Sequence, residues 1–446
     1  MTLTQQQVLA LAPDAASAAA GKKLARPGDW KNLGQSELAY WGQCQGSALY
    51  QVQVDRSDTT GKCSCPSRKF PCKHVLGLLL LAADGGAAVP AGATPDFVSE
   101  WLDKRQGAAA KKAQKAESPP AEVDLAAQEK RAAERRRRVK DGLDTLELWL
   151  ADLMRNGLAN LAQEGGAIWR TQAARLVDAQ APALAGRLQR LAEVPGSGRD
   201  WAARLLAELG KISLLIEAHR RLESLPAGLA ADVRHAIGWT TSSGEVLASG
   251  ERVDDSWLVA SCQQEDDERV RLRRFWLHGL RSGRQALILQ FAVAGQAFSS
   301  GPEVGGALAP GMVVDGELAF FPSAWPQRAL FRETRGMNAF SGQLPGVGGF
   351  AEYFDGVASA LAQQPFLDRL PALLPAVVPV LQAGELRLVD RDGLSVVASA
   401  ADPWRLLALG GGRPLDLAGE WNGRQLVCLS WLAADRLEPL TAAVGD

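Results

Sequence analysis

The sequence predicts a multidomain α+β protein with a small N-terminal module, a central helical domain and a C-terminal strand-rich α+β domain. Three observations support this prediction. A chain of 446 residues is too long for one ordinary hydrophobic core. Three of its six cysteines and one of its four histidines fall within residues 62–74. After Gly238 the hydrophobic pattern changes from helical spacing to alternation between apolar and polar residues.

The overall composition indicates a globular protein of a reducing compartment. Hydrophobic residues make up 47% and charged residues 22%, and the net charge of −1 does not indicate a general nucleic-acid binder. Six cysteines are too few for a disulfide framework in a chain of 446 residues. No apolar run approaches the ~18 residues of a membrane span, and the N-terminus lacks a basic signal-peptide region. We therefore expect a cytoplasmic protein.

Changes in composition and periodicity divide the chain into four segments. We assign residues 1–103 to a metal-binding module, 104–140 to a basic linker, 141–237 to a helical domain and 238–446 to a strand-rich α+β domain. The linker has twelve cations against five acids, so it carries +7 while the rest of the chain carries −8. We expect it to be flexible around Pro119-Pro120 and helical afterwards.

Elements of both kinds are predicted beyond the linker. Apolar residues recur at spacings of three and four after Gly142, and helical runs are expected at 166–193, 199–222 and 226–236. Asp392-Gly393 and Asn422-Gly423 predict hairpin turns, since these residues tolerate positive φ. Strands are expected at 257–262, 270–277, 285–293, 313–321 and 328–333, and a helical stretch at 350–382.

The stretch KCSCPSRKFPCKH holds a complete set of metal ligands. Cys63 and Cys65 end a predicted hairpin, where residues two apart point to the same side. Cys72 and His74 stand at the start of an apolar helix. Three thiolates and one imidazole favour Zn²⁺, and four protein ligands complete a tetrahedral shell. We therefore predict one structural zinc ion that supplies much of the module's folding free energy.

Other interpretations of these cysteines are buried reduced thiols or a Cys–Cys bond. Neither explains why a histidine completes the set at this spacing. Cys44 could place a fifth thiol near the metal, but a packed cysteine is the simpler expectation because four ligands already fill the shell.

The ligand motif resembles the SWIM-type zinc finger. The segments AYWGQCQGS, YQVQVD, KCSCPSRKFPCKHVLGLLLL and FVSEWLDKR, within about residues 28–105, resemble the bacterial SWIM zinc-finger family in particular. The resemblance implies a ββα finger with Cys63, Cys65, Cys72 and His74 as ligands. Other SWIM proteins include chromatin-remodelling ATPases, transposase-related proteins and a kinase-linked ubiquitin ligase. The resemblance thus implies binding of DNA or protein, including an ATPase supplied in trans.

Two functional hypotheses follow. In the first, the protein is a non-enzymatic adaptor whose finger and other domains each hold a protein partner. In the second, it binds nucleic acid, and cations of the finger and linker neutralise phosphates. The candidate contacts are Lys62, Arg68, Lys69, Lys73, Arg135, Arg136, Arg137 and Arg138. HExxH, GxSxG and phosphate-loop motifs are missing from the sequence, so we expect no catalytic residues.

Overall fold

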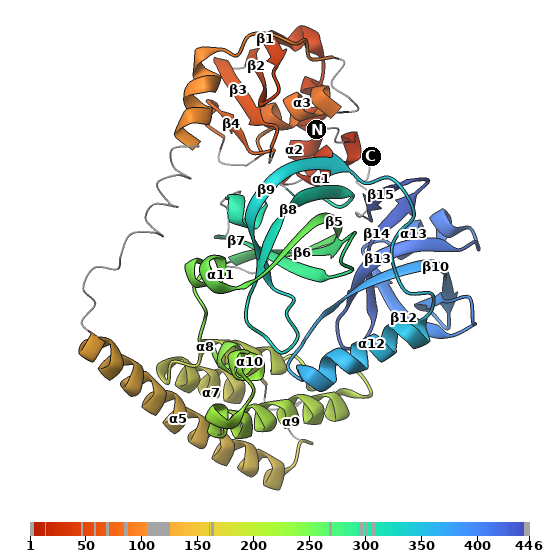
Figure 1. Cartoon of the computed structure of the whole chain (residues 1–446). Coiled ribbons are helices and arrows are strands. Elements are labelled where there is room, and N and C mark those ends of the chain that lie inside the picture. The colour runs from red at the N-terminus through yellow and green to blue at the C-terminus, as the bar shows by residue number, and fades with distance from the viewer. Residues whose placement is uncertain are drawn as a thin grey trace.

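The computed structural model describes residues 4–13, 15–45, 48–57, 59–67, 71–83, 88–105, 125–159, 161, 165–266, 270–293, 298, 301–305 and 308–440. In Figure 1 the N-terminal module lies at the top, two strand-rich units occupy the middle and a helical bundle lies at the bottom. A mixed α+β multidomain architecture with a strand-rich C-terminal part is thus confirmed. Within these ranges no helix is long and apolar enough to cross a membrane.

The N-terminal module is a four-stranded antiparallel sheet with helices on both faces. Helices α1 to α3 pack on one face, and a helix over residues 96–105 packs against Ala39 and Trp41 on the other. Its sheet order is β1-β2-β3-β4, and β3 and β4 form the predicted hairpin, with Val52 opposite Cys63. Gly21 and Gly77 let two helices approach closely, because a Cβ on Gly77 would lie 2.9 Å from Leu24 Cβ. The elements are α1 (Gln5–Ala10), α2 (Ala15–Leu24), β1 (Trp30–Gln35), β2 (Ala39–Gln45), β3 (Leu49–Asp55), β4 (Gly61–Cys63) and α3 (Lys73–Ala82).

The helical bundle begins before the predicted boundary at residue 141. Helix α5 runs from Leu125 to Asn156, and its buried stripe of Val139, Leu143, Leu146, Leu150 and Leu153 starts inside the segment assigned to the linker. That spacing of four and three residues is the helical signal. The remaining helices are α7 (Ala167–Asp178), α8 (Pro182–Leu191), α9 (Trp201–Arg220) and α10 (Ala227–Ile237).

The run predicted as one helix at 166–193 is two helices. Gln180 adopts a φ of 63°, and Pro182 then opens α8 at its first turn. A proline is favoured at that position because its missing N–H has no partner there in any helix. The chain therefore reverses between α7 and α8.

The first strand-rich unit is a five-stranded antiparallel sheet in the order β7-β6-β5-β8-β9. It curls until the two edges approach, since Leu287 in β7 forms an isolated bridge with Arg328. Helix α11 (Ser243–Ser249) precedes it, with a Ser242–Glu245 capping box. The strands are β5 (Glu251–Asp266), β6 (Val270–Gly279), β7 (Gln285–Val293), β8 (Met312–Phe320) and β9 (Ala329–Ala339).

The second strand-rich unit has the order β12-β11-β10-β13-β14-β15, and a parallel β12–β14 pairing closes five of its strands into a small barrel. Helix α12 (Phe350–Gln363) covers one side of it (Figure 1). The other elements are β10 (Leu370–Gln382), β11 (Glu385–Val389), β12 (Ser395–Ala400), α13 (Pro403–Gly410), β13 (Leu415–Trp421), β14 (Leu426–Ala433) and β15 (Arg436–Pro439). Both predicted hairpin turns are present, with Gly393 and Gly423 at positive φ.

The predicted helical stretch at 350–382 is wrong in its second half, which is strand β10. Prolines at 371, 375 and 379 remove N–H donors that a helix would need. The strand tolerates them because its register shifts between Leu374 and Val377, where Ala376 has a φ of 57°. It pairs with β13 before this bulge and mainly with β11 after it.

The N-terminal module and the first strand-rich unit share one hydrophobic core. Val8 and Leu11 of α1 are buried, as are the apolar residues of α3, Trp257 in β5 and Phe275 in β6. Gln7 Nε2 donates to the carbonyl of Pro310, 303 residues away in sequence. The segment assigned as 1–103 is therefore packed onto the C-terminal half.

A buried carboxylate connects the two strand-rich units. Glu420 of β13 is fully buried and accepts hydrogen bonds from Trp276 Nε1 at 2.8 Å, Arg369 Nη1 at 2.7 Å and Arg274 Nη2 at 3.3 Å. Glu265 accepts from the same two arginines at 2.8 and 3.0 Å. Removing one partner of such a network leaves a buried charge uncompensated.

We predict that Glu420→Gln lowers the free energy of unfolding by roughly 3 kcal/mol, because Arg274 loses its buried counter-ion. Glu385→Gln is the matched control, since this exposed carboxylate pairs with Arg387 at 3.7 Å and should contribute less than about 1 kcal/mol. Urea denaturation of both variants measures the difference. Equal shifts of the two midpoints would contradict this role for Glu420.

Candidate metal centre

The structure brings Cys63, Cys65, Cys72 and His74 together. Their ligand atoms all lie within 4.8 Å of one another. Cys63 ends β4 and Cys65 follows it, whereas Cys72 is the N-cap residue of α3 and His74 lies in its first turn. A hairpin end and a helix start thus each supply two ligands.

The distances fit one tetrahedrally coordinated zinc ion. His74 Nδ1 lies 3.7 Å from Cys63 Sγ and 4.0 Å from Cys72 Sγ. A tetrahedron with Zn–S bonds of ~2.3 Å and a Zn–N bond of ~2.0 Å has sulfur–nitrogen edges of roughly 3.6 Å. Three sulfurs and one nitrogen are a donor set that suits zinc. These four residues form a site for one structural zinc ion, as the sequence predicted.

The thiols of this cluster are electrostatically coupled. A hydrogen bond from the Cys63 thiol lowers the pKa of Cys72 to about 4, and contacts with His74 and the Val75 amide act in the same direction. The same hydrogen bond raises the pKa of Cys63, and burial raises that of Cys65. The Cys72 thiol lies at the positive end of helix α3, a position that also favours its thiolate form.

The imidazole is held by its surroundings. His74 is buried at 4% exposure, and its ring centroid lies 5.0 Å from that of Tyr50 in β3. Helix α3 fixes its backbone directly behind the Cys72 cap. Burial and the Tyr50 contact hold the ring with Nδ1 toward the sulfurs of Cys63 and Cys72, which lowers the entropic cost of coordination.

Cys44 lies outside this set of four. It is fully buried in β2 opposite Tyr50, and burial raises the pKa of its thiol. Among the described residues, Cys44 does not belong to the group that could hold a metal here. That group is Cys63, Cys65, Cys72 and His74. The structure thus agrees with a packed cysteine at this position.

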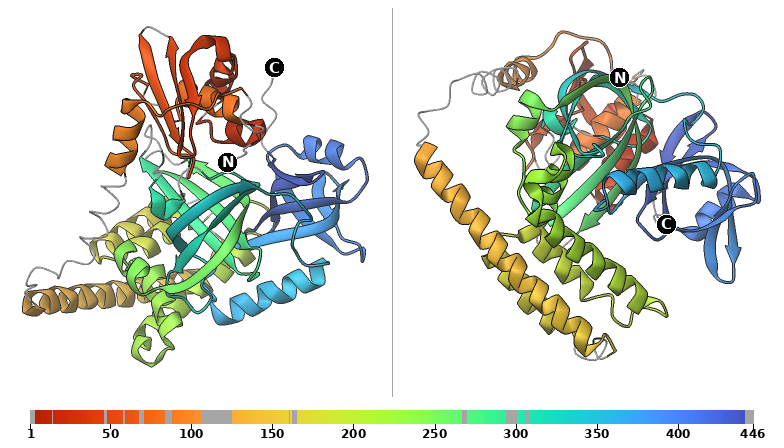
Figure 2. Two further views of the ribbon diagram at one scale, coloured as in Figure 1. Left: turned by 45° about the horizontal axis from the view of Figure 1, so that its top comes forward. Right: turned by 60° about the horizontal axis from the view of Figure 1, so that its bottom comes forward.

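The described residues among the predicted nucleic-acid contacts lie in two separate places. Lys62 and Lys73 are exposed on the finger, while Arg68 and Lys69 lie outside the described residues. The run from Arg135 to Arg138 lies on α5, at the opposite end of the molecule from the finger (Figures 1 and 2).

Three of those arginines make contacts within the bundle. Arg135 donates to the carbonyl of Gly238 and lies over the Trp239 ring. Arg137 and Arg138 both pair with Glu134 at 3.1 Å.

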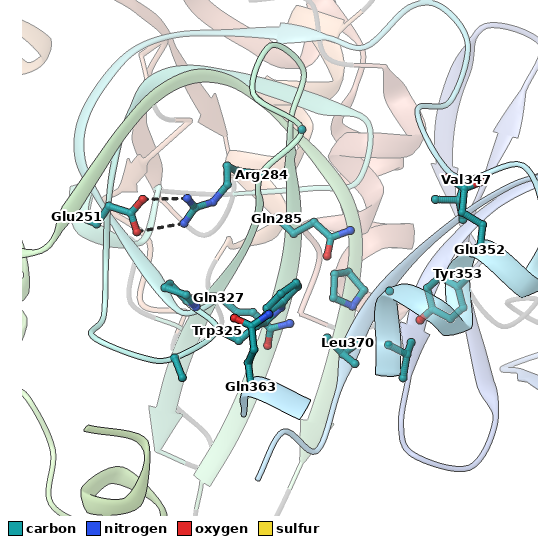
Figure 3. Close-up of a pocket in the computed structure, with 16 residues that line it drawn as sticks. Glu251, Arg284, Gln285, Trp325, Gln327, Val347, Glu352, Tyr353, Gln363 and Leu370 are labelled. Carbon is teal, nitrogen blue, oxygen red and sulfur yellow. Dashed lines mark hydrogen bonds and ion pairs between the residues drawn. The ribbon is translucent and has the colours of Figure 1, made fainter. Parts of the chain in front are cut away.

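A pocket of about 550 Å³ that the sequence does not predict lies between the two strand-rich units (Figure 3). Trp325, Tyr353, Leu370 and three glutamines line it, and a Glu251–Arg284 ion pair borders it. Tyr353 OH and Gln327 Nε2 are buried, and neither has a hydrogen-bond partner among the residues that the structure describes. The walls of this pocket come from segments up to 120 residues apart (251 to 371), so no local sequence motif predicts the pocket.

We predict one zinc ion per chain in the purified protein and its loss in the double variant Cys72→Ser/His74→Ala, because two ligands cannot close a tetrahedral shell. Cys44→Ala is the control, as it removes a neighbouring thiol without touching the set of four. Inductively coupled plasma mass spectrometry measures the zinc. Equal zinc in the double variant and the wild type, or its loss in Cys44→Ala, would contradict the assignment.

Comparisons with known families agree with this geometry. Residues 50–83 match the SWIM zinc finger, a range that contains all four ligands. Residues 134–237 match the SWIM-associated four-helix bundle domain, which corresponds to the central helices. Among curated proteins and among solved structures, no significant match is found. The chain thus contains a SWIM zinc finger followed by the helical bundle domain that accompanies such fingers.

Proposed function

We propose that the protein is a non-enzymatic adaptor, in which a zinc-stabilised finger module and the domains behind it each attach a protein partner. The burial of α3 is the observation that carries this proposal. All nine residues from His74 to Ala82 are buried, and Lys73 is the one exposed residue of this helix.

A buried helix cannot read DNA as a recognition helix does. Such a helix lies in the major groove and contacts base edges with its exposed side chains. Helix α3 is instead covered by the sheet on one side and by α1 and α2 on the other. This arrangement supports a finger that acts as a rigid platform, whose outer surfaces are its connecting loops and the part of the sheet that the helix over residues 96–105 leaves uncovered.

The α5 arginines favour the same proposal. Arg135 joins α5 to the Gly238–Trp239 segment, and the Glu134 pairs partly neutralise Arg137 and Arg138. These contacts give three of the four cations a role within the bundle. The zinc shell also supports a non-enzymatic role, since four protein ligands leave no position for a reacting water.

Nucleic-acid binding is the second candidate, because Lys62 and Lys73 are both exposed beside the metal centre. Two phosphate contacts would give a shallow salt dependence, with a slope near −0.9 per contact on duplex DNA. An ATPase acting in trans is the class of protein partner that the SWIM resemblance favours for the adaptor.

We predict that the immobilised full-length protein captures a protein partner from lysate of its own cells, and that cross-links from Lys31, Lys62 or Lys73 map to the partner. The Cys72→Ser/His74→Ala variant should lose these cross-links, because the platform depends on the metal. Cross-linking mass spectrometry measures both. Retention of the same cross-links in this variant would contradict a zinc-dependent platform.

The two candidate functions are separated with the same preparation. Duplex DNA and single-stranded RNA are titrated with wild type and with Lys62→Gln/Lys73→Gln at two salt concentrations. Salt-sensitive binding that the lysine substitutions abolish would favour the nucleic-acid function over the adaptor.

A further inference from the structure

A second cavity, of about 630 Å³, lies where the helical bundle meets the strand-rich units. Its walls come from α8 and α9 of the bundle, from the segment just before β10, and from the β13–β14 turn. Residues as far apart as Arg187 and Arg424 therefore face one cavity.

The lining is strongly basic. It contains seven cations against three acids, although the whole chain has a net charge of −1. Six of the seven cations are arginines, whose planar guanidinium binds carboxylate or phosphate through two parallel hydrogen bonds. The cations are Arg187, Arg190, Arg204, Lys211, Arg274, Arg369 and Arg424, and the acids are Glu208, Glu265 and Asp368.

Part of this charge is fixed in place by the fold. Arg187 is mostly buried and pairs with Glu208 at 2.9 Å and Asp368 at 3.3 Å. Arg274 and Arg369 belong to the Glu420 network described above. These ion pairs hold the wall rigid, so its remaining positive potential is preorganised before a ligand arrives.

Two arginines of the lining are held less tightly. Arg190 of α8 and Arg424 of the β13–β14 turn are exposed, and in the described part of the chain neither forms an ion pair within 4.0 Å, although the charge of Arg190 acts on Glu265. The turn itself is fixed, because Asn422 Oδ1 accepts hydrogen bonds from the backbone N–H groups of Arg424 and Gln425. The exposed guanidinium groups of Arg190 and Arg424 can therefore bind an anion.

We propose that this cavity is a binding site for an acidic segment of a partner protein, with Arg190 and Arg424 as its ligand-contacting residues. Leu191, Val194 and Leu367 give the cavity apolar patches that suit the aliphatic parts of a peptide. Its lining contains no aromatic side chain, so it lacks the stacking platform typical of single-stranded nucleic-acid sites. The inference rests on the adaptor function and names the chemistry of one partner.

The test uses the full-length protein and fluorescence anisotropy with three labelled probes. These are a hexaglutamate peptide, a peptide with three phosphoserines, and a thymidine heptanucleotide whose six phosphates match the charge of hexaglutamate. We expect at least one peptide to bind. We expect Arg190→Gln/Arg424→Gln to weaken that binding roughly tenfold, because each arginine makes a charge-assisted contact at a partly solvated site.

Arg175→Gln/Arg413→Gln is the matched control. It removes the same charge from the bundle and from the second strand-rich unit at two exposed arginines that do not line the cavity. The affinity of this control variant for the peptides should stay within about twofold of the wild-type value. The two peptides distinguish carboxylate from phosphate as the anion.

Equal losses in the two double variants, or no binding of either peptide, would overturn the site. Heptanucleotide binding as tight as that of the better peptide would overturn the peptide assignment. Cross-linking from the finger lysines, repeated on Arg190→Gln/Arg424→Gln, separates the two proposals. If the cross-links to the partner persist and the substitutions leave peptide affinity unchanged, the cavity site is overturned and the adaptor function stands.

Discussion

The arrangement of the N-terminal module depends on one constraint, which is that a hairpin end and a helix start converge on a single metal position. Cys63 and Cys65 come from the β3–β4 hairpin, and Cys72 and His74 come from the start of α3. The segment between the two pairs contributes no regular element among its described residues. Coordination therefore holds the sheet and the helix at a fixed mutual position.

That fixed position matters because α3 is the centre of a larger core. The sequence suggested a small finger with little core of its own. In the structure α3 packs against its sheet, against α1 and α2, and through α1 against the first strand-rich unit. The metal consequently stabilises a junction between distant parts of the chain, and hydrophobic burial shares the work of holding the finger.

Local features of the structure were predictable and features made by distant segments were not. The ligand set followed from spacing. Two ligands that are two residues apart in a strand, and two that are two residues apart at a helix start, can converge on one ion. The turns at Gly393 and Gly423 followed from residue type. The helix prediction for β10 is wrong because its apolar run has no clear period. Its three prolines are a local signal against a helix, and its pairing with β11 and β13 makes it a strand. Neither cavity has a sequence signal.

The burial of α3 and the basic cavity describe one molecule with two separate surfaces. Helix α3 of the finger faces inward, and the basic cavity lies where the bundle meets the strand-rich units. The two places differ in how positive and negative groups are arranged. Near the metal, cations lie beside thiolates, whereas in the cavity arginines exceed the acids that hold them.

X-ray absorption at the zinc edge tests the central claim most directly, because it reports the atoms bound to the metal in the intact protein. The account predicts three sulfurs at ~2.3 Å and one nitrogen at ~2.0 Å, with no oxygen ligand. A shell with a water oxygen, or with two sulfurs, would show that these four side chains do not close around one ion.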